Sequence, residues 1–376
     1  MILYDLTSVQ PFSNAKYHGG GKFAQIIFNR MVERDIQFSV FYDSTRFIDA
    51  QVIEMCKNKN LGIFDISKMS FDDIHAKSKA TIVFSILPKP YMFRYKTVGT
   101  IHDIRSIDEE LDKYQVRYKM DLSRKIRYHI HKILHKYQRN KNIKYLRNTV
   151  SHPNFHPTTI TLFTKYAIME VLRDVKVLNM PVFMTPSYYM GICERKDLYD
   201  GKYILMLSGN RPVKNILRAI EALDNIFDMQ ICSEYKVIIT GVSNSNLFKY
   251  KIRNIQQFLF KGYVEESDLE SLYAHCSFLL FPSTYEGFGM PAQEAMYFGK
   301  PVIASSLTAI PEVCGNAAIY INPFSVSDIA SKVLMLLSEK SLYTEYVEKS
   351  KNRFAELFCH QQSDIDKYID YVLSLS

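Results

Sequence analysis

The sequence contains no apolar run long enough to span a membrane, no C-x-x-C pair and no tryptophan. Its longest apolar runs, such as Phe278–Phe281, are far shorter than the roughly 18 residues of a membrane-spanning helix. The N-terminus has no basic flank before an apolar core, so we expect no signal peptide. The six cysteines lack metal-binding spacing, which indicates packing as small hydrophobic residues in a reducing compartment. We therefore expect a globular, cytoplasmic protein.

Acidic residues are nearly missing from residues 113–147, which carry twelve Lys or Arg and one acid, Asp121. The segment's charge, 12 − 1 = +11, exceeds the formal net charge of +8 for the whole chain. Apolar residues recur in it at the spacing of one helix face: Ile126, Ile130, Ile133, Leu134 and Tyr137. This pattern predicts a basic amphipathic helix, whose apolar stripe either packs on its own domain or binds an anionic membrane surface. Nucleic-acid binding is a third interpretation, but no nucleic acid is expected as a partner.

Short apolar runs alternate with helical patterns along all 376 residues, a length that suffices for two domains. Apolar runs between helices are typical of buried parallel strands, so the pattern predicts an α/β, doubly wound architecture. The predicted strands are Ile2–Tyr4, Phe38–Phe41, Thr81–Ile86, Thr97–Ile101, Ile160–Phe163, Pro181–Met184, Tyr203–Leu207, Val237–Thr240, Phe278–Phe281 and Pro301–Ala304. Two helical patterns close the chain, near Leu342–Phe358 and Asp364–Leu373.

A polar stretch between two predicted strands marks the best domain boundary. The resulting division is an N-terminal domain at 1–186, a linker at 187–202, a C-terminal domain at 203–358 and a C-terminal helix at 359–376.

The strongest local pattern is FLLFPSTYEGFGMPAQEAMYFGKPVIA, residues 278–304. An apolar strand leads into a glycine-rich loop that begins at Glu286, and Pro291 suits the first position of a helix. Glu294 would then lie in the first turn of that helix. Glycines let a backbone approach a ligand closely, and amides at a helix N-terminus can hold phosphate or hydroxyl oxygens. The two carboxylates could bind hydroxyls at two ends of a ligand; alternatively, Glu294 only balances the helix dipole and Glu286 is a solvated loop acid.

The same segment resembles the E-x7-E motif of retaining GT-B glycosyltransferases, specifically family 4, in its EGFG-P-x-x-E-A-M and G-K-P-V-I-A wording. The resemblance implies two Rossmann-like doubly wound domains that face each other across a cleft, with a C-terminal helix that returns to the N-terminal domain. It also implies that Glu286 contacts the transferred sugar and that Glu294 binds the ribose hydroxyls of the donor. The backbone that it places beside the donor belongs to Gly287, Phe288, Gly289 and Met290.

Two further segments match the family and carry candidate catalytic side chains. TVGTIHDIRSI places His102 after an apolar strand, where the family has a His beside the donor sugar and the leaving phosphate. LSGNRPVKN resembles the family segment whose basic residues, here Arg211 and Lys214, clamp the donor diphosphate. This match is imperfect, because Val213 replaces a basic residue and Arg211 precedes the Pro. Asn215 is expected to cap the following helix.

Two more segments carry donor-binding candidates that act through their backbone. HGGGK follows the first predicted strand and resembles the N-terminal glycine loop of the family, so the amides of Gly19, Gly20 and Gly21 could approach a phosphate. LFKGYVEESDLESLYAHC resembles the segment whose backbone meets the nucleobase, at Tyr263 and Val264.

The resemblance implies a hexosyltransferase that moves a sugar from a GDP- or UDP-linked donor to a hydroxyl of a glycan or polyprenyl-diphosphate-linked acceptor, with retention of configuration. It points to the biosynthesis of a surface polysaccharide such as lipopolysaccharide O-antigen or capsule, on the inner face of the membrane. No metal or other cofactor is expected, because the single D-x-D, Asp364–Asp366, lies in a helical pattern. The alternatives are another GT-B enzyme, such as a nucleotide-sugar epimerase, and a catalytically degenerate scaffold subunit.

Overall fold

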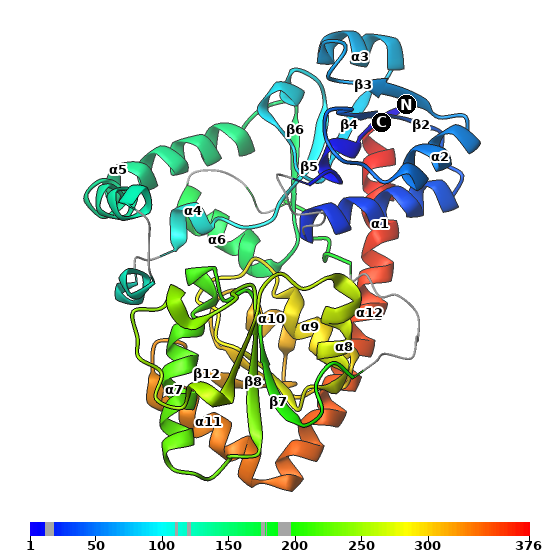
Figure 1. Ribbon diagram of the computed structural model, residues 1–376. Helices are drawn as coiled ribbons and strands as arrows, with labels where there is room; N and C mark the ends of the chain where they lie inside the picture. Colours follow the sequence, from blue (N-terminus) through cyan, green and yellow to red (C-terminus); the bar gives the residue numbers. More distant parts are fainter. Residues whose placement is uncertain (12–18, 110–111, 119–121, 174–176, 178, 187–196) are drawn as a thin grey trace. The chain divides into compact units, whose positions relative to one another are not determined.

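The computed structural model (Figure 1) describes residues 1–11, 19–109, 112–118, 122–173, 177, 179–186 and 197–376. The chain divides into two compact units. Unit 1 comprises Met1–Ile104, Lys141–Tyr189 and Phe358–Ser376, and unit 2 comprises Arg105–Asn140 and Met190–Leu357. The linker predicted at 187–202 lies mostly outside the described residues. Among the described residues, no helix combines the length and the apolar character that crossing a bilayer requires.

Unit 1 is built on a parallel sheet of six strands in the order β3-β2-β1-β4-β5-β6. Its strands are β1 (Ile2–Asp5), β2 (Phe38–Tyr42), β3 (Gly62–Asp65), β4 (Ile82–Ser85), β5 (Thr97–Ile101) and β6 (Phe155–Thr159). Its helices include α1 (Gly19–Glu33), α2 (Ala50–Asn58), α3 (Phe71–Ser78) and α6 (Leu162–Leu172). Strands β1 and β4 are buried along their whole length, as expected for strands covered on both faces.

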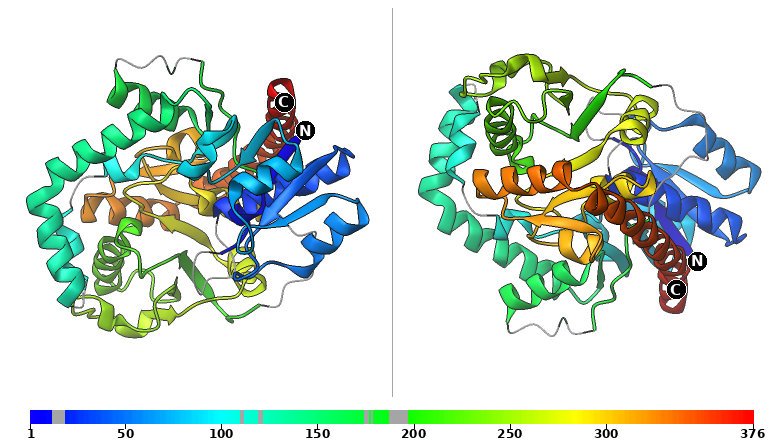
Figure 2. Two further views of the ribbon diagram at one scale, coloured as in Figure 1. Left: turned by 90° about the horizontal axis from the view of Figure 1, so that it is seen from above. Right: turned by 90° about the horizontal axis from the view of Figure 1, so that it is seen from below.

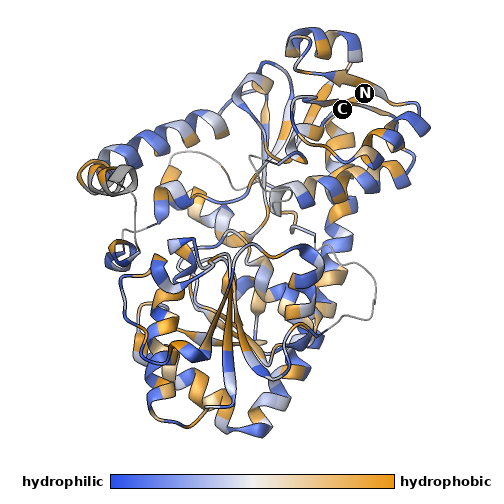
Figure 3. Ribbon diagram, viewed as in Figure 1, coloured by the Kyte–Doolittle hydropathy of each residue, from blue (hydrophilic) through white to orange (hydrophobic). Residues whose placement is uncertain are grey.

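Unit 2 carries a second parallel sheet of six strands, in the order β12-β11-β10-β7-β8-β9. Its strands are β7 (Lys202–Met206), β8 (Tyr235–Thr240), β9 (Phe258–Lys261), β10 (Phe278–Phe281), β11 (Val302–Ser305) and β12 (Ala318–Ile321). Its helices include α4 (Arg105–Asp108), α7 (Ile216–Asp228), α8 (Glu266–His275), α9 (Met290–Tyr297), α10 (Ile310–Cys314) and α11 (Val326–Ser338). Most strands of this sheet carry the hydrophobic colour in Figure 3.

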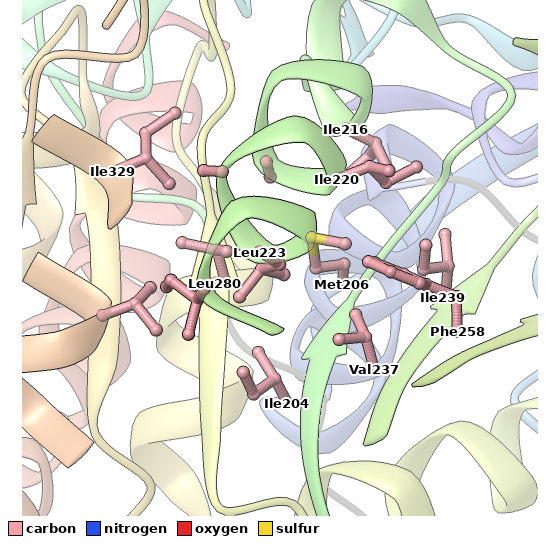
Figure 4. Close-up of a cluster of buried hydrophobic side chains, with 14 of the residues drawn as sticks. Ile204, Met206, Ile216, Ile220, Leu223, Val237, Ile239, Phe258, Leu280 and Ile329 are labelled. Atoms are coloured by element: carbon pink, nitrogen blue, oxygen red, sulfur yellow. The ribbon is translucent and has the colours of Figure 1, made fainter. Parts of the chain in front are cut away.

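Successive residues of these strands face two separate apolar cores, because side chains alternate across a sheet. Ile204 of β7 packs with α7 and α11 on one face, and Leu205 packs with α8, α9 and α10 on the other. Figure 4 shows the first core, in which Ile220 and Leu223 of α7 lie over the sheet. Both faces are therefore covered by helices, and polar side chains are left to the loops at the strand ends.

Eight of the ten predicted strands are the inner strands of the two sheets, two are not strands, and the four edge strands were missed. Strands β3, β6, β9 and β12 each have a neighbour on one side only. Residues after 159 were predicted as a strand but start α6 at Leu162, and Val182 forms only an isolated bridge with Thr159. Strands β3, β6 and β9 are partly exposed and include residues such as Pro157 of β6, so their sequences are not apolar at every position. Strand β12 is apolar and mostly buried, yet the sequence analysis also missed it.

The two helical patterns at the end of the chain form one helix, α12 (Lys340–Leu375), which the right-hand view of Figure 2 shows without a break. Its residues before Phe358 belong to unit 2 and its later residues to unit 1, as the predicted return of the C-terminal helix requires. Tyr368, which is fully buried, joins Thr100 and Thr158 through hydroxyl hydrogen bonds of 2.8 Å each. The last turns of α12 are thus part of the core of unit 1.

Asp366 of α12 forms an ion pair with Arg30 of α1, and the contribution of this pair to stability can be measured. Arg30 donates to both carboxylate oxygens, at 2.9 and 2.8 Å, and this hydrogen bonding lowers the pKa of Asp366. A lowered folded-state pKa contributes stability that is present above the ordinary value and is lost as pH falls through the lowered one. We expect Asp366→Asn to cost about 0.5–1 kcal/mol at neutral pH, because the pair is partly exposed and screened, and to cost little at acidic pH. Thermal denaturation at both pH values measures this, with Asp370→Asn as the more exposed control.

Candidate functional site

The carboxyl ends of β7 and β10 form the switch point of the unit 2 sheet. From β7 the chain builds outward to β8 and β9, and from β10 it builds in the opposite direction to β11 and β12. Loops that follow two such neighbouring strands diverge, and ligands of open α/β sheets bind in the opening between them. One of these loops carries Arg211 and Lys214, and the other carries Glu286. The sheet topology therefore brings together segments that are about 70 residues apart in the sequence.

Lys214 and Glu286 form a direct ion pair at this switch point. The Lys214 Nζ lies 2.6 Å from the Glu286 Oε1, and the Ser283 hydroxyl donates to the same oxygen at 2.6 Å. Lys214 is only 5% exposed, and its Nζ lies 5.1 Å from the centre of the Phe281 ring. The acidic and basic groups that sequence reasoning assigned to the sugar and the diphosphate are thus adjacent.

The backbone around Glu286 is held by hydrogen bonds to neighbouring loops. The Glu286 amide donates to the Thr308 hydroxyl at 3.1 Å, and the Thr284 amide donates to the Val213 carbonyl at 2.8 Å. Gly289, which precedes α9, has a φ of +103°, a conformation that residues with a Cβ rarely adopt. The Phe288 side chain is buried in this loop. The loop geometry from Glu286 to Met290 therefore depends on a glycine at position 289.

Glu294 lies one residue further along α9 than predicted. Because the helix begins at Met290, Glu294 is in its second turn and no acidic residue occupies the first. Its Oε2 accepts a hydrogen bond of 2.6 Å from the hydroxyl of Tyr273, a buried residue of α8. A role in balancing the helix dipole is weakened by this position, because the dipole acts within the first turn. The carboxylate is instead oriented by Tyr273, a partner that the sequence did not reveal.

Asn215 occupies the position before α7 but does not cap the helix with its side chain, contrary to expectation. It adopts a left-handed conformation with a φ of 55°. Its side-chain amide donates to the carbonyls of Pro282, at 3.1 Å, and Pro323, at 2.6 Å. Asn215 therefore ties the loop after β7, with Lys214, to the loop after β10, with Glu286.

A strap of residues 112–118 reinforces this junction from outside the predicted site. The Arg218 guanidinium, which is 2% exposed, donates to the Asn215 Oδ1 at 2.9 Å and to both carboxylate oxygens of Asp112. The Tyr114 ring centre lies 3.7 Å from the Arg218 Cζ. The Tyr118 hydroxyl accepts a hydrogen bond from the Leu217 amide, and burial raises its pKa to about 12. These contacts explain why residues 105–140, predicted to belong to the N-terminal domain, are part of unit 2.

The candidates in unit 1 gather near the switch point of its own sheet, between β1 and β4. Gly19, Gly20 and Gly21 open α1, as predicted, and a Cβ on Gly20 would lie 3.1 Å from Leu87 in the loop after β4. His102 follows β5, and its Nε2 lies 3.0 Å from the carbonyl oxygen of Ile86 in the same loop. The His18 that precedes the glycines lies outside the described residues.

A buried carboxylate, which sequence reasoning missed, holds the first loop of unit 1. Asp5 at the end of β1 is fully buried and accepts hydrogen bonds from the hydroxyls of Thr7, Ser8 and Ser85 and from the Thr7 amide, at 2.6–2.9 Å. A buried carboxylate is tolerated when it receives several such donors. The Asp5 cluster joins the loops after β1 and β4. The loop after β4 contacts His102 and lies close to Gly20. The D-L-T-S order at the end of the first strand was its only signal in the sequence.

The remaining predicted side chains are more exposed. Arg211 is exposed at the start of the short 3₁₀ helix Pro212–Lys214, and Tyr263 is 69% exposed in the loop between β9 and α8. Val264 packs partly against the core beneath α8 and α9. The structure therefore joins Lys214 with Glu286 directly, whereas the donor contacts predicted for Arg211, Tyr263 and Val264 stay predictions.

Comparison with known proteins shows that part of the chain resembles a known family. Residues 195–353 match the family described as glycosyl transferases group 1. This segment is similar to the domains of that family. It includes the switch point of unit 2 and both loops that carry Lys214 and Glu286. An O-antigen chain mannosyltransferase B from Escherichia coli is 31% identical over 162 residues, which are 42% of this chain and 42% of that protein. The chain thus matches less than half the length of this relative.

Solved structures extend the likeness to the whole chain at the level of the fold. A glycosyltransferase from Rickettsia africae has a TM-score of 0.69 at 15% identity and covers 100% of this chain and 98% of its own. Anabaena HepE in complex with UDP and glucose has a TM-score of 0.64 at 14% identity, with 99% of each chain covered. The segment that resembles group 1 glycosyl transferases therefore belongs to a two-domain α/β chain of the GT-B fold, as predicted.

Proposed function

We propose that the protein transfers a hexose from a nucleoside-diphosphate sugar to a hydroxyl group of a glycan or lipid-linked acceptor. The Lys214–Glu286 ion pair at the switch point is the observation that supports this most. A sugar nucleotide carries a sugar hydroxyl and a phosphate oxygen only a few bonds apart. A carboxylate and an ammonium 2.6 Å from each other can take one of these groups each.

The reaction breaks the bond between the anomeric carbon and the phosphate oxygen, and the acceptor oxygen forms a new bond to that carbon. Negative charge develops on the departing diphosphate, where Lys214, Arg211 and backbone amides can stabilise it. In this proposal Glu286 binds the transferred sugar, Glu294 binds the ribose, and His102 lies beside the leaving phosphate. We further propose retention of configuration, with the leaving phosphate helping to deprotonate the acceptor, and catalysis without a metal ion.

The relatives suggest which sugar and which product are involved. The E. coli protein is named as an O-antigen chain mannosyltransferase, and it is similar to 42% of this chain. We therefore propose a hexose such as mannose as the transferred sugar and a surface polysaccharide as the product. A cytoplasmic location is supported by Cys56, Cys232, Cys276, Cys314 and Cys359, which are free thiols in the structure. We also propose that the enzyme uses a polyprenyl-diphosphate-linked acceptor at the inner face of the membrane.

The binding of nucleotides tests the donor site directly. We expect GDP, UDP or one of their sugars to raise the melting temperature, since a ligand at about 100 times its Kd adds about 2.7 kcal/mol to the free energy of unfolding. Glu294→Ala is expected to weaken that ligand about 10- to 100-fold, because it removes a charged hydrogen-bond acceptor. Titration calorimetry measures the loss, and Glu234→Ala, an exposed carboxylate of the same unit, is the control. Equal affinity of Glu294→Ala and the control would contradict the proposed ribose contact.

A further inference from the structure

Helix α5 (Leu122–Val150) has an unusual charge for a helix of its length. Its 29 residues include nine Lys or Arg and neither Asp nor Glu. Hydrophobic residues interrupt its hydrophilic ribbon in Figure 3. The sequence leaves open whether these residues pack on the protein or face outward.

The structure decides this question, because the apolar stripe of α5 faces solvent. Ile133 is 80% exposed and Tyr137 is 68% exposed, and Ile126, Ile130 and Leu134 are also exposed. Their spacing of i, i+4, i+7, i+8 and i+11 gathers them into one stripe along the helix. The ordinary interpretation, in which this stripe packs on its own domain, is therefore wrong.

The protein contacts the opposite side of α5. Leu146 and Val150 are buried, and the Arg139 Nε donates to the Ile107 carbonyl at 3.1 Å. At 3.6 residues per turn these residues lie roughly 200–240° around the helix from Ile126. The helix is thus held by one side, and its apolar side remains available for an external partner.

We propose that the exposed stripe of α5 binds the surface of an anionic lipid bilayer. Its aliphatic side chains would enter the boundary between headgroups and acyl chains, as in helices that lie in the plane of a membrane. Lys141 and Lys144 continue the stripe toward the C-terminal end and are exposed, so their ammonium groups would meet lipid phosphates. Tyr137 combines an apolar ring with a polar hydroxyl, which suits the same boundary.

The charge of α5 favours lipid over the other occupants of an apolar stripe. Two copies of α5 would bring nine positive charges against nine, with no acid on either helix to pair with them. A nucleic acid would satisfy the charges but would leave four exposed aliphatic side chains in contact with water or phosphate. An anionic bilayer provides both hydrocarbon and negative charge.

Binding of the full chain to vesicles tests the proposal. We expect cosedimentation with phosphatidylcholine vesicles that contain phosphatidylglycerol, much weaker cosedimentation without it, and a decrease as salt screens the charges. Ile133→Asp and the double variant Lys141→Glu/Lys144→Glu should each weaken partitioning by at least about tenfold. The matched controls are Ile255→Asp and Lys57→Glu/Lys340→Glu, which change exposed residues of the same types outside α5 and should bind normally.

The outcomes separate this proposal from the transfer reaction. The lipid-binding proposal rests on the proposed function only for the identity of the membrane. All α5 variants and their controls should therefore keep the nucleotide affinity of the unmodified chain. Unchanged vesicle binding by both α5 variants would overturn the lipid surface and leave the donor site untouched. A dimer that Ile133→Asp dissociates, seen by light scattering, or an RNA hairpin that displaces the protein from vesicles would also overturn it. Loss of nucleotide binding by Glu294→Ala with normal vesicle binding would leave both proposals standing.

Discussion

Glu286→Gln is expected to lower the rate of sugar transfer about 100- to 1,000-fold and to change nucleotide affinity by no more than about twofold. The substitution keeps the size of the side chain and an oxygen that can accept the Ser283 hydroxyl. It removes the negative charge that Lys214 contacts at 2.6 Å. Because the proposed partner of Glu286 is the transferred sugar and not the nucleotide, the effect should appear in kcat more than in nucleotide binding.

The measurement is transfer from GDP-mannose and from UDP-glucose, with nucleotide binding followed separately by calorimetry. Glu234→Gln, an exposed carboxylate of unit 2, should behave as the unmodified chain does. A full rate in Glu286→Gln would refute the assignment of the catalytic site. A protein that binds nucleotide but transfers no sugar to any acceptor before mutation would instead favour the scaffold alternative.

Arg218→Ala is expected to destabilise unit 2 by about 3–5 kcal/mol, because it leaves the Asp112 carboxylate without its buried partner. Arg218 is 2% exposed, and the Asp112 side chain is 14% exposed. The substitution also removes the donor to Asn215 and the cation that stacks on the Tyr114 ring. Scanning calorimetry should show the loss in the transition that nucleotide shifts, which identifies the unfolding of unit 2.

The double variant Arg218→Met/Asp112→Leu separates loss of the ion pair from loss of packing. Replacing both members of a buried ion pair by apolar residues is often neutral or stabilising, so it should recover most of the stability lost in Arg218→Ala. The control Arg253→Ala removes a guanidinium that is 46% exposed in the same unit, and its cost should be smaller. A double variant as unstable as Arg218→Ala would show that the strap depends on the guanidinium itself.

The interior of each sheet could be predicted from the sequence, and its edges could not. Interior strands such as Phe278–Phe281 are apolar at every position because helices cover both faces. Gly62–Asp65 and Phe258–Lys261 are partly exposed, and each combines apolar residues with a charged one, so neither is apolar at every position. The end of the chain was also predicted incompletely. Polar residues between two apolar patterns suggested two helices, whereas the structure has one helix, α12.

The candidate site divides in a similar way. Glu286, Glu294, Lys214 and His102 were proposed from sequence because each lies in a short segment with glycine, proline or strand residues at fixed spacing. Their partners were not found, since Tyr273, Ser283 and the Asp112–Arg218 pair belong to segments with no such pattern. Asn215 was found but given the wrong role, because its left-handed conformation turns its amide away from the helix.

The sequence by itself determined the α/β class, the inner strands, the motif residues and the basic, amphipathic character of residues 122–150. These are properties of consecutive residues, and periodicity or short spacing is enough to express them. Only the tertiary structure decided that Lys214 reaches Glu286, that Tyr273 orients Glu294, and that Ile133 and Tyr137 face solvent and not a core. The first two facts depend on which distant segments meet at the end of a strand. The third depends on which side of a helix packs on the protein, and neither can be predicted from local sequence.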